Sequence, residues 1–134
     1  MKLVRQKHRT GCGLACVAMI AGISYKETFS FARHAFNWQK TESNFRTDSN
    51  DLRTLLSVLK IKTEKGRSVR KISSLSDKAI VAINYNEDRE TWHWVVFLRE
   101  KEKEYFLDPR TKKILRTDFT RMRLRSFIPV TGTK

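Results

Sequence analysis

The chain has 134 residues, enough for one domain with one hydrophobic core and too few for two ordinary domains. Lysine and arginine number 28 against 14 acidic residues, a formal net charge of +14, while 40% of the residues are hydrophobic. This composition excludes a disordered chain, and the 5 glycines, 2 prolines and 2 cysteines exclude collagen-like, linker-like and disulfide-rich proteins. We predict a basic globular protein whose single domain spans residues 1–134.

The first element along the chain is a nearly apolar run, Gly13–Ile23. It is shorter than the roughly 18 residues that a membrane span needs. Basic residues precede it, as in a signal peptide, but Cys16 lies inside it and no cleavage site of small residues follows. We therefore expect no membrane span and a protein that acts in the cytoplasm.

Three helices are predicted in the N-terminal half. Residues 13–21 are apolar on nearly every side, which indicates a buried helix with Thr10 as its N-cap and Gly22 at its end. Ser24 and Glu27 have the spacing of a capping box at the start of a second helix. The apolar stripe of this second helix comprises Phe29, Ala32, Ala35 and Phe36.

A polar segment, residues 37–50, is predicted as a loop that leads to a third helix capped by Asp48 or Ser49. Leu52, Leu55, Leu56 and Leu59 form the apolar stripe of this helix. Strand patterns follow at Ala79–Asn84, Thr91–Arg99 and Tyr105–Leu107, with a further candidate at Lys112–Leu115. Helices first and strands later predict an α+β fold with a mostly antiparallel sheet.

Basic residues gather in two segments that could contact a polyanion such as RNA. The same residues could equally form a solvated surface that keeps the protein soluble. They are Lys60, Lys62, Lys65, Arg67, Arg70 and Lys71 in the first segment, and Arg116, Arg121, Arg123 and Arg125 in the second.

Cys12 is the first candidate for chemistry. It lies at the start of the first predicted helix, where unpaired N–H groups and the helix dipole favour a thiolate. Gly11 and Gly13 leave room beside it for a substrate. A structural cysteine and a metal ligand are the alternatives, although Cys12, Cys16 and a histidine do not have a zinc-site spacing. We expect Cys16 to be a buried core residue, and we expect no metal or other cofactor.

Of the three histidines, His8 and His34 are predicted at the surface and His93 in a central strand. A buried histidine needs a partner for each ring nitrogen, so His93 is either a satisfied core residue or a base. A hairpin turning between Glu100 and Lys101 would place His93 directly opposite Asp108. That carboxylate would then fix the imidazole tautomer and leave the second nitrogen for a thiol.

Cysteine, histidine and aspartate in this order are typical of a papain-like site. Gln6, Cys12 with the residues up to Ile20, the block His93–Val96, and Asp108–Pro109 resemble the motifs of the bacteriocin-processing cysteine peptidases. These peptidases are papain-like domains that are attached to exporters and that cleave leader peptides ending in two glycines. Members usually carry an acidic residue before the nucleophile, where this chain has Gly11.

The resemblance implies a papain-like fold and a role for each matched residue. Cys12 would be the nucleophile, His93 the base, and Asp108 the residue that orients His93. Gln6 would donate to the oxyanion together with the backbone N–H of Cys12.

Three functional hypotheses follow. The first is a cysteine peptidase, or a deamidase or acyl transferase using the same thioester, acting on an acidic peptide or protein. The second is a papain-like effector that binds or cleaves RNA such as tRNA. The third is a non-catalytic binding module in which Cys12 only packs; the presence of all four motif residues weighs against it.

Overall fold

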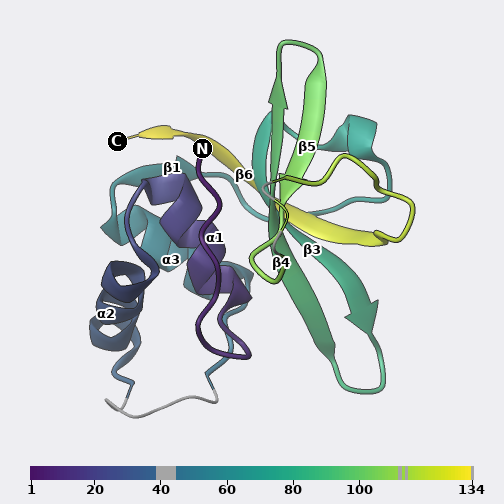
Figure 1. Cartoon of the computed structure of the whole chain (residues 1–134). Helices are drawn as coiled ribbons and strands as arrows, with labels where there is room; N and C mark the ends of the chain where they lie inside the picture. Colours follow the sequence, from purple (N-terminus) through teal and green to yellow (C-terminus); the bar gives the residue numbers. More distant parts are fainter. Residues whose placement is uncertain (39–44, 112, 114, 134) are drawn as a thin grey trace.

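The computed structural model describes residues 1–38, 45–111, 113 and 115–133. Three helices precede the strands, and the helices pack together beside a twisted sheet (Figure 1). The helices are α1 (Cys12–Ala21), α2 (Tyr25–Phe36) and α3 (Ser49–Val58). The strands are β1 (Ile61–Thr63), β2 (Arg67–Ser68), β3 (Lys78–Asn86), β4 (Thr91–Glu100), β5 (Lys103–Leu107) and β6 (Leu124–Thr133), with a short 3-10 helix at Ile72–Ser74. The predicted α+β class is confirmed.

Helix α1 is buried from Cys12 through Met19, as expected for a segment that is apolar on all sides. It ends where Gly22 adopts a left-handed conformation, with φ 71°, and donates its N–H to the Ala18 carbonyl. The predicted N-cap was wrong by one residue. Gly11 occupies that position, because the chain turns there with a hydrogen bond from Gly11 N–H to the His8 carbonyl.

Helices α2 and α3 begin with the predicted capping residues. The Ser24 hydroxyl accepts from Glu27 N–H at 3.0 Å, and the Asp48 carboxylate accepts from Asp51 N–H at 2.8 Å. The predicted stripe of α3 is correct for Leu52, Leu55 and Leu56, which are fully buried, and Leu59 is partly buried. In α2, Ala32 is fully buried and Phe29 and Phe36 are partly buried, but Ala35 is exposed, contrary to the prediction.

The sheet has the order β1-β6-β3-β4-β5, with β2 also paired to β6, and every pairing is antiparallel. The strands predicted at 79–84, 91–99 and 105–107 correspond to β3, β4 and β5. Strand β6 was not predicted, although it pairs with both β1 and β3 inside the sheet. Of the candidate strand Lys112–Leu115, residues 112 and 114 lie outside the described residues, and Lys113 and Leu115 are not in a strand. Residues 39–44 of the predicted loop also lie outside them.

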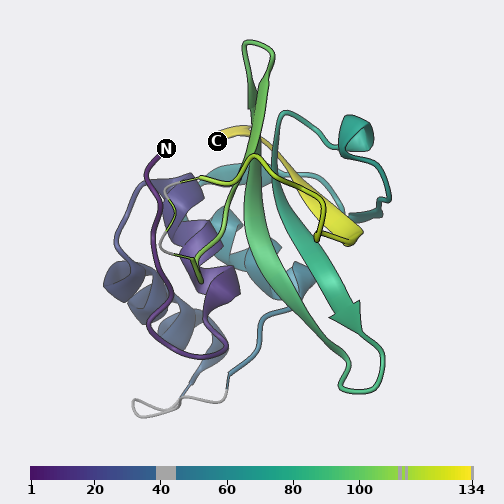
Figure 2. The ribbon, with the colours of Figure 1, turned by 45° about the vertical axis from the view of Figure 1, so that its right-hand side comes forward.

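Apolar side chains cover both faces of the sheet. On one face, Trp94, Val96 and Ile128 pack against the three helices. On the other, Val95, Phe97 and Phe106 pack with residues from the 3-10 segment and from the chain before β6. Figure 2 shows the same division, with the helices on one side of the sheet and the 3-10 helix on the other.

The β4–β5 hairpin turns at Lys101 and Glu102, which have φ 47° and 71°, as a type I′ turn requires. The predicted turn was therefore misplaced, and the register differs by two residues. Phe97, rather than Val95, lies opposite Phe106. The observed register stacks these two rings, with centroids 5.0 Å apart, and pairs Arg99 with Glu104 at 2.9 Å.

None of the helices in the described part of the chain combines the length and the hydropathy needed to cross a bilayer.

Candidate active site

Cys12 is the first residue of α1 and lies against β4. Its side chain is buried, with 6% of the residue exposed. The backbone N–H of Trp94 lowers the pKa of the Cys12 thiol. The start of α1 approaches the sheet closely because Gly13 has no side chain: a Cβ there would lie 2.3 Å from Thr47 Oγ1 and 3.1 Å from Trp94 Cδ1. Glycine at position 13 thus allows the helix N-terminus to carry Cys12 up to the strand that bears His93.

His93 and Asp108 are buried, and the imidazole Nε2 lies 2.6 Å from Asp108 Oδ1. An ionised carboxylate only accepts hydrogen bonds, so Nε2 carries the proton. The predicted contact between these residues is present, whereas the predicted direct pairing is not. Strand pairing ends at Val96 and Leu107, so Asp108 lies one residue beyond the ladder. The two-residue error in register preserved the face of each side chain, because side chains alternate with a period of two.

Two further donors hold the Asp108 carboxylate. Arg110 N–H donates to Oδ1 at 2.9 Å, and Arg116 Nη1 donates to Oδ2 at 3.1 Å. Arg116 is itself fixed by backbone hydrogen bonds in both directions with Phe106. Burial raises the pKa of Asp108, but the hydrogen bond and charge of His93, with Arg110 and Arg116, outweigh it and lower that pKa below its usual value. Asp108 is therefore a carboxylate at neutral pH.

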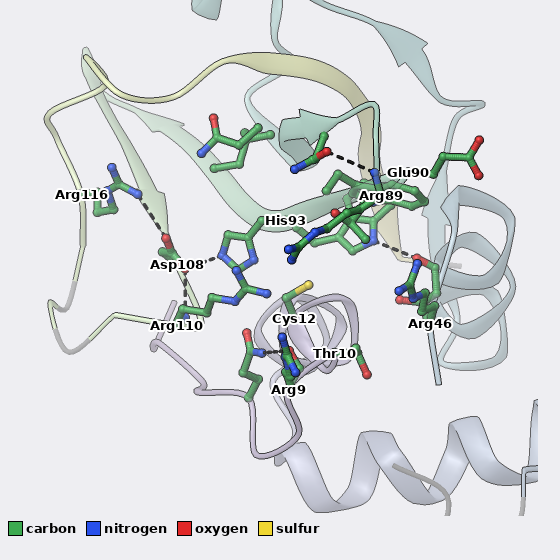
Figure 3. Close-up of a pocket in the computed structure, with 18 residues that line it drawn as sticks. Arg9, Thr10, Cys12, Arg46, Arg89, Glu90, His93, Asp108, Arg110 and Arg116 are labelled. Atoms are coloured by element: carbon green, nitrogen blue, oxygen red, sulfur yellow. Dashed lines mark hydrogen bonds and ion pairs between the residues drawn. The ribbon is translucent and has the colours of Figure 1, made fainter. Parts of the chain in front are cut away.

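The Cys12 thiol lies beside the His93 ring (Figure 3). His93 Nδ1 is buried and has no hydrogen-bond partner, oxygen, nitrogen or sulfur, among the described residues. Burial raises the pKa of Cys12, but His93, the Trp94 N–H and the charge of Arg110 lower it to a net value below that of a free thiol. Burial lowers the pKa of His93, but Asp108 and Cys12 raise it to a net value above the usual one. Both shifts favour a thiolate–imidazolium pair.

Gln6 lies in the segment before α1. Its Nε2 donates to the His8 carbonyl at 3.0 Å and to the Arg9 carbonyl at 2.9 Å, while its Oε1 is buried without a partner in the described residues. Its backbone N–H donates to the Pro109 carbonyl at 3.3 Å. Gln6 thus ties the segment before Cys12 to the loop that carries Asp108.

A cleft of about 1210 Å³ contains all four residues singled out by the sequence, Gln6, Cys12, His93 and Asp108. Trp94 also lines the cleft and belongs to the predicted block His93–Val96, whereas the remaining lining residues apart from Arg116 were not predicted. These are Arg9, Thr10, Arg46, Thr47, Ile83, Asn84, Asn86, Arg89, Glu90, Thr91, Trp92 and Arg110. They come from separate loops and strand ends, and no sequence pattern links them.

The other cysteine and the other histidines lie outside this cleft. Cys16 is fully buried as predicted, and burial raises the pKa of its thiol well above the usual value. His34 is exposed as predicted. His8 is not a simple surface residue: its Nδ1 lies 2.7 Å from the Tyr25 hydroxyl, and its ring stacks on Phe29.

The two basic segments lie largely away from the cleft. Among their members within the described residues, Arg116 alone lines it. Strand β2 pairs with β6, and Val69 N–H donates to the Arg125 carbonyl, so the two segments adjoin. Within the part of the chain that the structure describes, no group of three or more histidine, cysteine or acidic side chains could hold a metal ion.

Comparison with known proteins assigns the chain to a family. No curated protein sequence matches the chain. Residues 1–122, about nine-tenths of the chain, match the Peptidase C39 family. A buried cysteine at a helix N-terminus beside a histidine–carboxylate pair is the site expected of a cysteine peptidase. The chain therefore belongs to the Peptidase C39 family, a family of papain-like cysteine peptidases.

Proposed function

We propose that this chain hydrolyses a peptide or amide bond through a thioester at Cys12. The observation that carries the proposal is the 2.6 Å hydrogen bond between His93 and Asp108 beside a cysteine whose pKa is lowered. A cysteine that only packed in a core would have its pKa raised by burial, as Cys16 has. The two cysteines of this chain thus provide an internal comparison.

Each residue has a defined task in the proposed reaction. The Cys12 thiolate attacks the carbonyl carbon, and the tetrahedral intermediate expels the amine, which takes its proton from the His93 imidazolium. Neutral His93 then removes a proton from water, and the resulting attack on the thioester releases the acid and returns the proton to the Cys12–His93 pair. Asp108 holds Nε2–H throughout and so keeps Nδ1 directed at the sulfur.

The negative oxygen of the intermediate needs hydrogen-bond donors. We propose that the backbone N–H of Cys12 and the Gln6 side chain supply them, each worth about 3 kcal/mol in comparable sites. In the structure both hydrogens of Gln6 Nε2 are directed to the carbonyls of His8 and Arg9. Gln6 must therefore release one of these carbonyls when the substrate binds. The unpartnered Oε1 leaves the amide with few bonds to break.

Alkylation of the purified protein with iodoacetamide across pH tests the proposal. Cys12 should react with a midpoint below the free thiol value of about 8.5, and His93→Ala should raise that midpoint. Cys16→Ala is the matched control and should leave the profile unchanged, because Cys16 is fully buried. Labelling at Cys16 with Cys12 inert would overturn the proposal.

The net charge of +14 favours an acidic peptide or protein as the substrate. Deamidase, acyl-transferase and peptidase chemistry share the thioester and differ in the leaving group and in the attacking group. Mass spectrometry separates them: a deamidase adds about one mass unit without cleaving the chain, a peptidase yields two fragments, and a transferase yields an adduct.

Binding of RNA is a second candidate function, favoured by the adjacency of the two basic segments across β2 and β6. If these residues bind phosphates, the logarithm of the tRNA affinity should decrease steeply and linearly as the logarithm of the salt concentration increases. Replacing Arg70 and Arg123 with glutamine should then reduce the slope by about one per lost phosphate contact. Cleavage of RNA by the Cys12→Ala variant would show a nuclease that does not use the thiol.

A further inference from the structure

Arginines surround the Cys12 thiol from several segments of the chain. Arg9 precedes α1, Arg46 precedes α3, Arg89 lies in the β3–β4 turn, and Arg110 and Arg116 follow β5. Figure 3 shows Arg110 and Arg116 on the Asp108 side of Cys12, Arg46 on the other side, Arg89 reaching from that other side to above Cys12, and Arg9 below. The cationic groups thus flank the thiol on two sides.

Carboxylates of the protein do not balance these cations. The cleft is lined by two acidic residues, Glu90 and Asp108. Asp108 is already held by His93 and Arg116, and Glu90 points away from Cys12 in Figure 3. Within the described residues, the guanidinium groups of Arg9, Arg46, Arg89 and Arg110 make no ion pair.

Unpaired arginines that converge on one cleft repel one another, and a bound anion relieves that repulsion. The planar guanidinium binds a carboxylate through two parallel hydrogen bonds, which fixes direction as well as charge. Resting on the proposed hydrolase function, we propose that the cleft selects peptides with acidic side chains on both sides of the scissile bond. Arg46 and Arg89 bind the carboxylates on one side of the thiol, and Arg110 binds those on the other.

The lining of the cleft suits a peptide better than RNA. Amide and hydroxyl groups of Asn84, Asn86 and Thr91 lie among the arginines and can bond a peptide backbone. The basic residues of the first segment, 60–71, do not line the cleft and so supply no cation to a phosphate bound beside Cys12.

Fluorescence anisotropy with the Cys12→Ala variant measures binding separately from turnover. The probes are two labelled peptides of equal length with a central Ala-Ala, one with glutamates flanking it and one with glutamines at the same positions. The glutamate peptide should bind at least about tenfold more tightly at low salt. Adding Arg46→Gln and Arg89→Gln should reduce that preference, because Arg110 still binds the carboxylates on the other side of the thiol. Arg70→Gln with Arg121→Gln, which removes two exposed arginines outside the cleft, is the matched control and should not.

Equal binding of the two peptides, or a preference that Arg46→Gln with Arg89→Gln leaves undiminished, would overturn the proposal. So would tRNA binding that depends on Arg46 and Arg89 in the absence of peptide binding. The proposed hydrolase function fails in a different way. If the wild-type protein binds the glutamate peptide through these arginines and never cleaves it, acidic recognition stands and hydrolysis does not.

Discussion

His93 and Asp108 share a 2.6 Å hydrogen bond although they are not cross-strand partners. The ladder between β4 and β5 ends at Val96 and Leu107. Beyond it, Asp108 is held by the turn in which Thr111 N–H donates to its carbonyl, and by Arg116. The geometry of the pair therefore depends on the loop after β5 as well as on the sheet, which leads to separate predictions for the two residues of that loop.

Replacing Asp108 with asparagine should lower kcat/KM on the order of 100-fold, a typical loss for a disturbed acid–base pair. Burial lowers the pKa of His93 and Asp108 raises it above the usual value, so losing the carboxylate charge lowers it. The imidazolium is then lost at lower pH, and the alkaline limb of the kcat/KM profile should move to lower pH. An unshifted alkaline limb would show that Asp108 does not act through the charge of His93.

Replacing Arg116 with methionine should move the alkaline limb of the kcat/KM profile to higher pH. Arg116 donates to Asp108 Oδ2 at 3.1 Å, and its positive charge partly offsets the negative charge of the carboxylate. Without Arg116 the carboxylate stabilises the imidazolium more strongly, so the pKa of His93 rises. We expect kcat/KM to fall about tenfold, in line with one hydrogen bond to a charged group. Arg116→Lys should restore part of the rate, and Arg121→Met, an exposed change outside the cleft, should have no effect. A loss of rate with no shift of the limb would indicate a structural role only.

Local signals in the sequence were sufficient for most features of the helices. Ser24 as a cap and Leu52, Leu55 and Leu56 as the buried stripe of α3 depend on neighbours within a few positions and were predicted correctly, and Asp48 was one of the two predicted caps. Strand β6 was missed because its pairing partners are far away in the sequence and Pro129 lies within it. Proline argues against a central strand, since it cannot donate to the ladder.

The candidate site also contains residues that the sequence predicts and residues that it does not. Gln6, Cys12, His93 and Asp108 were predicted because their order and spacing resemble known motifs, and all four line one cleft in the structure. Arg46 and Arg89 carry no such signal, because a single arginine in a loop resembles any other exposed arginine. The β4–β5 register was wrong because it depended on Lys101 and Glu102 both adopting positive φ, which neither residue type predicts.

Replacing Gly11 with alanine should destabilise the fold by about 1–3 kcal/mol, the usual cost of overpacking. A Cβ at this position would lie 2.1 Å from the Tyr25 hydroxyl oxygen. Tyr25→Phe removes that oxygen, so a double-mutant cycle measured by urea unfolding should show coupling between the two positions. Gly22→Ala is the matched control. Its cost comes from a left-handed φ of 71° with no atom within 4 Å, and Tyr25→Phe should leave it unchanged. If the changes in the free energy of unfolding caused by Gly11→Ala and Tyr25→Phe were strictly additive, the predicted clash between the two positions would be contradicted.

Replacing Gln6 with alanine should separate stabilisation of the intermediate from activation of the thiol. If the Gln6 amide donates to the oxyanion, kcat should fall on the order of 100-fold. Alkylation by iodoacetamide displaces iodide at a saturated carbon and forms no oxyanion, so the rate of Cys12 alkylation should stay at the wild-type value. Gln6→Glu, which keeps the length of the side chain and replaces its N–H donors with a carboxylate, should lose as much. Gln6 also ties the carbonyls of His8 and Arg9, so a disordered segment before α1 is the competing explanation. That explanation predicts changed alkylation as well as lost turnover, and an unchanged kcat in the alanine variant would remove Gln6 from the oxyanion hole.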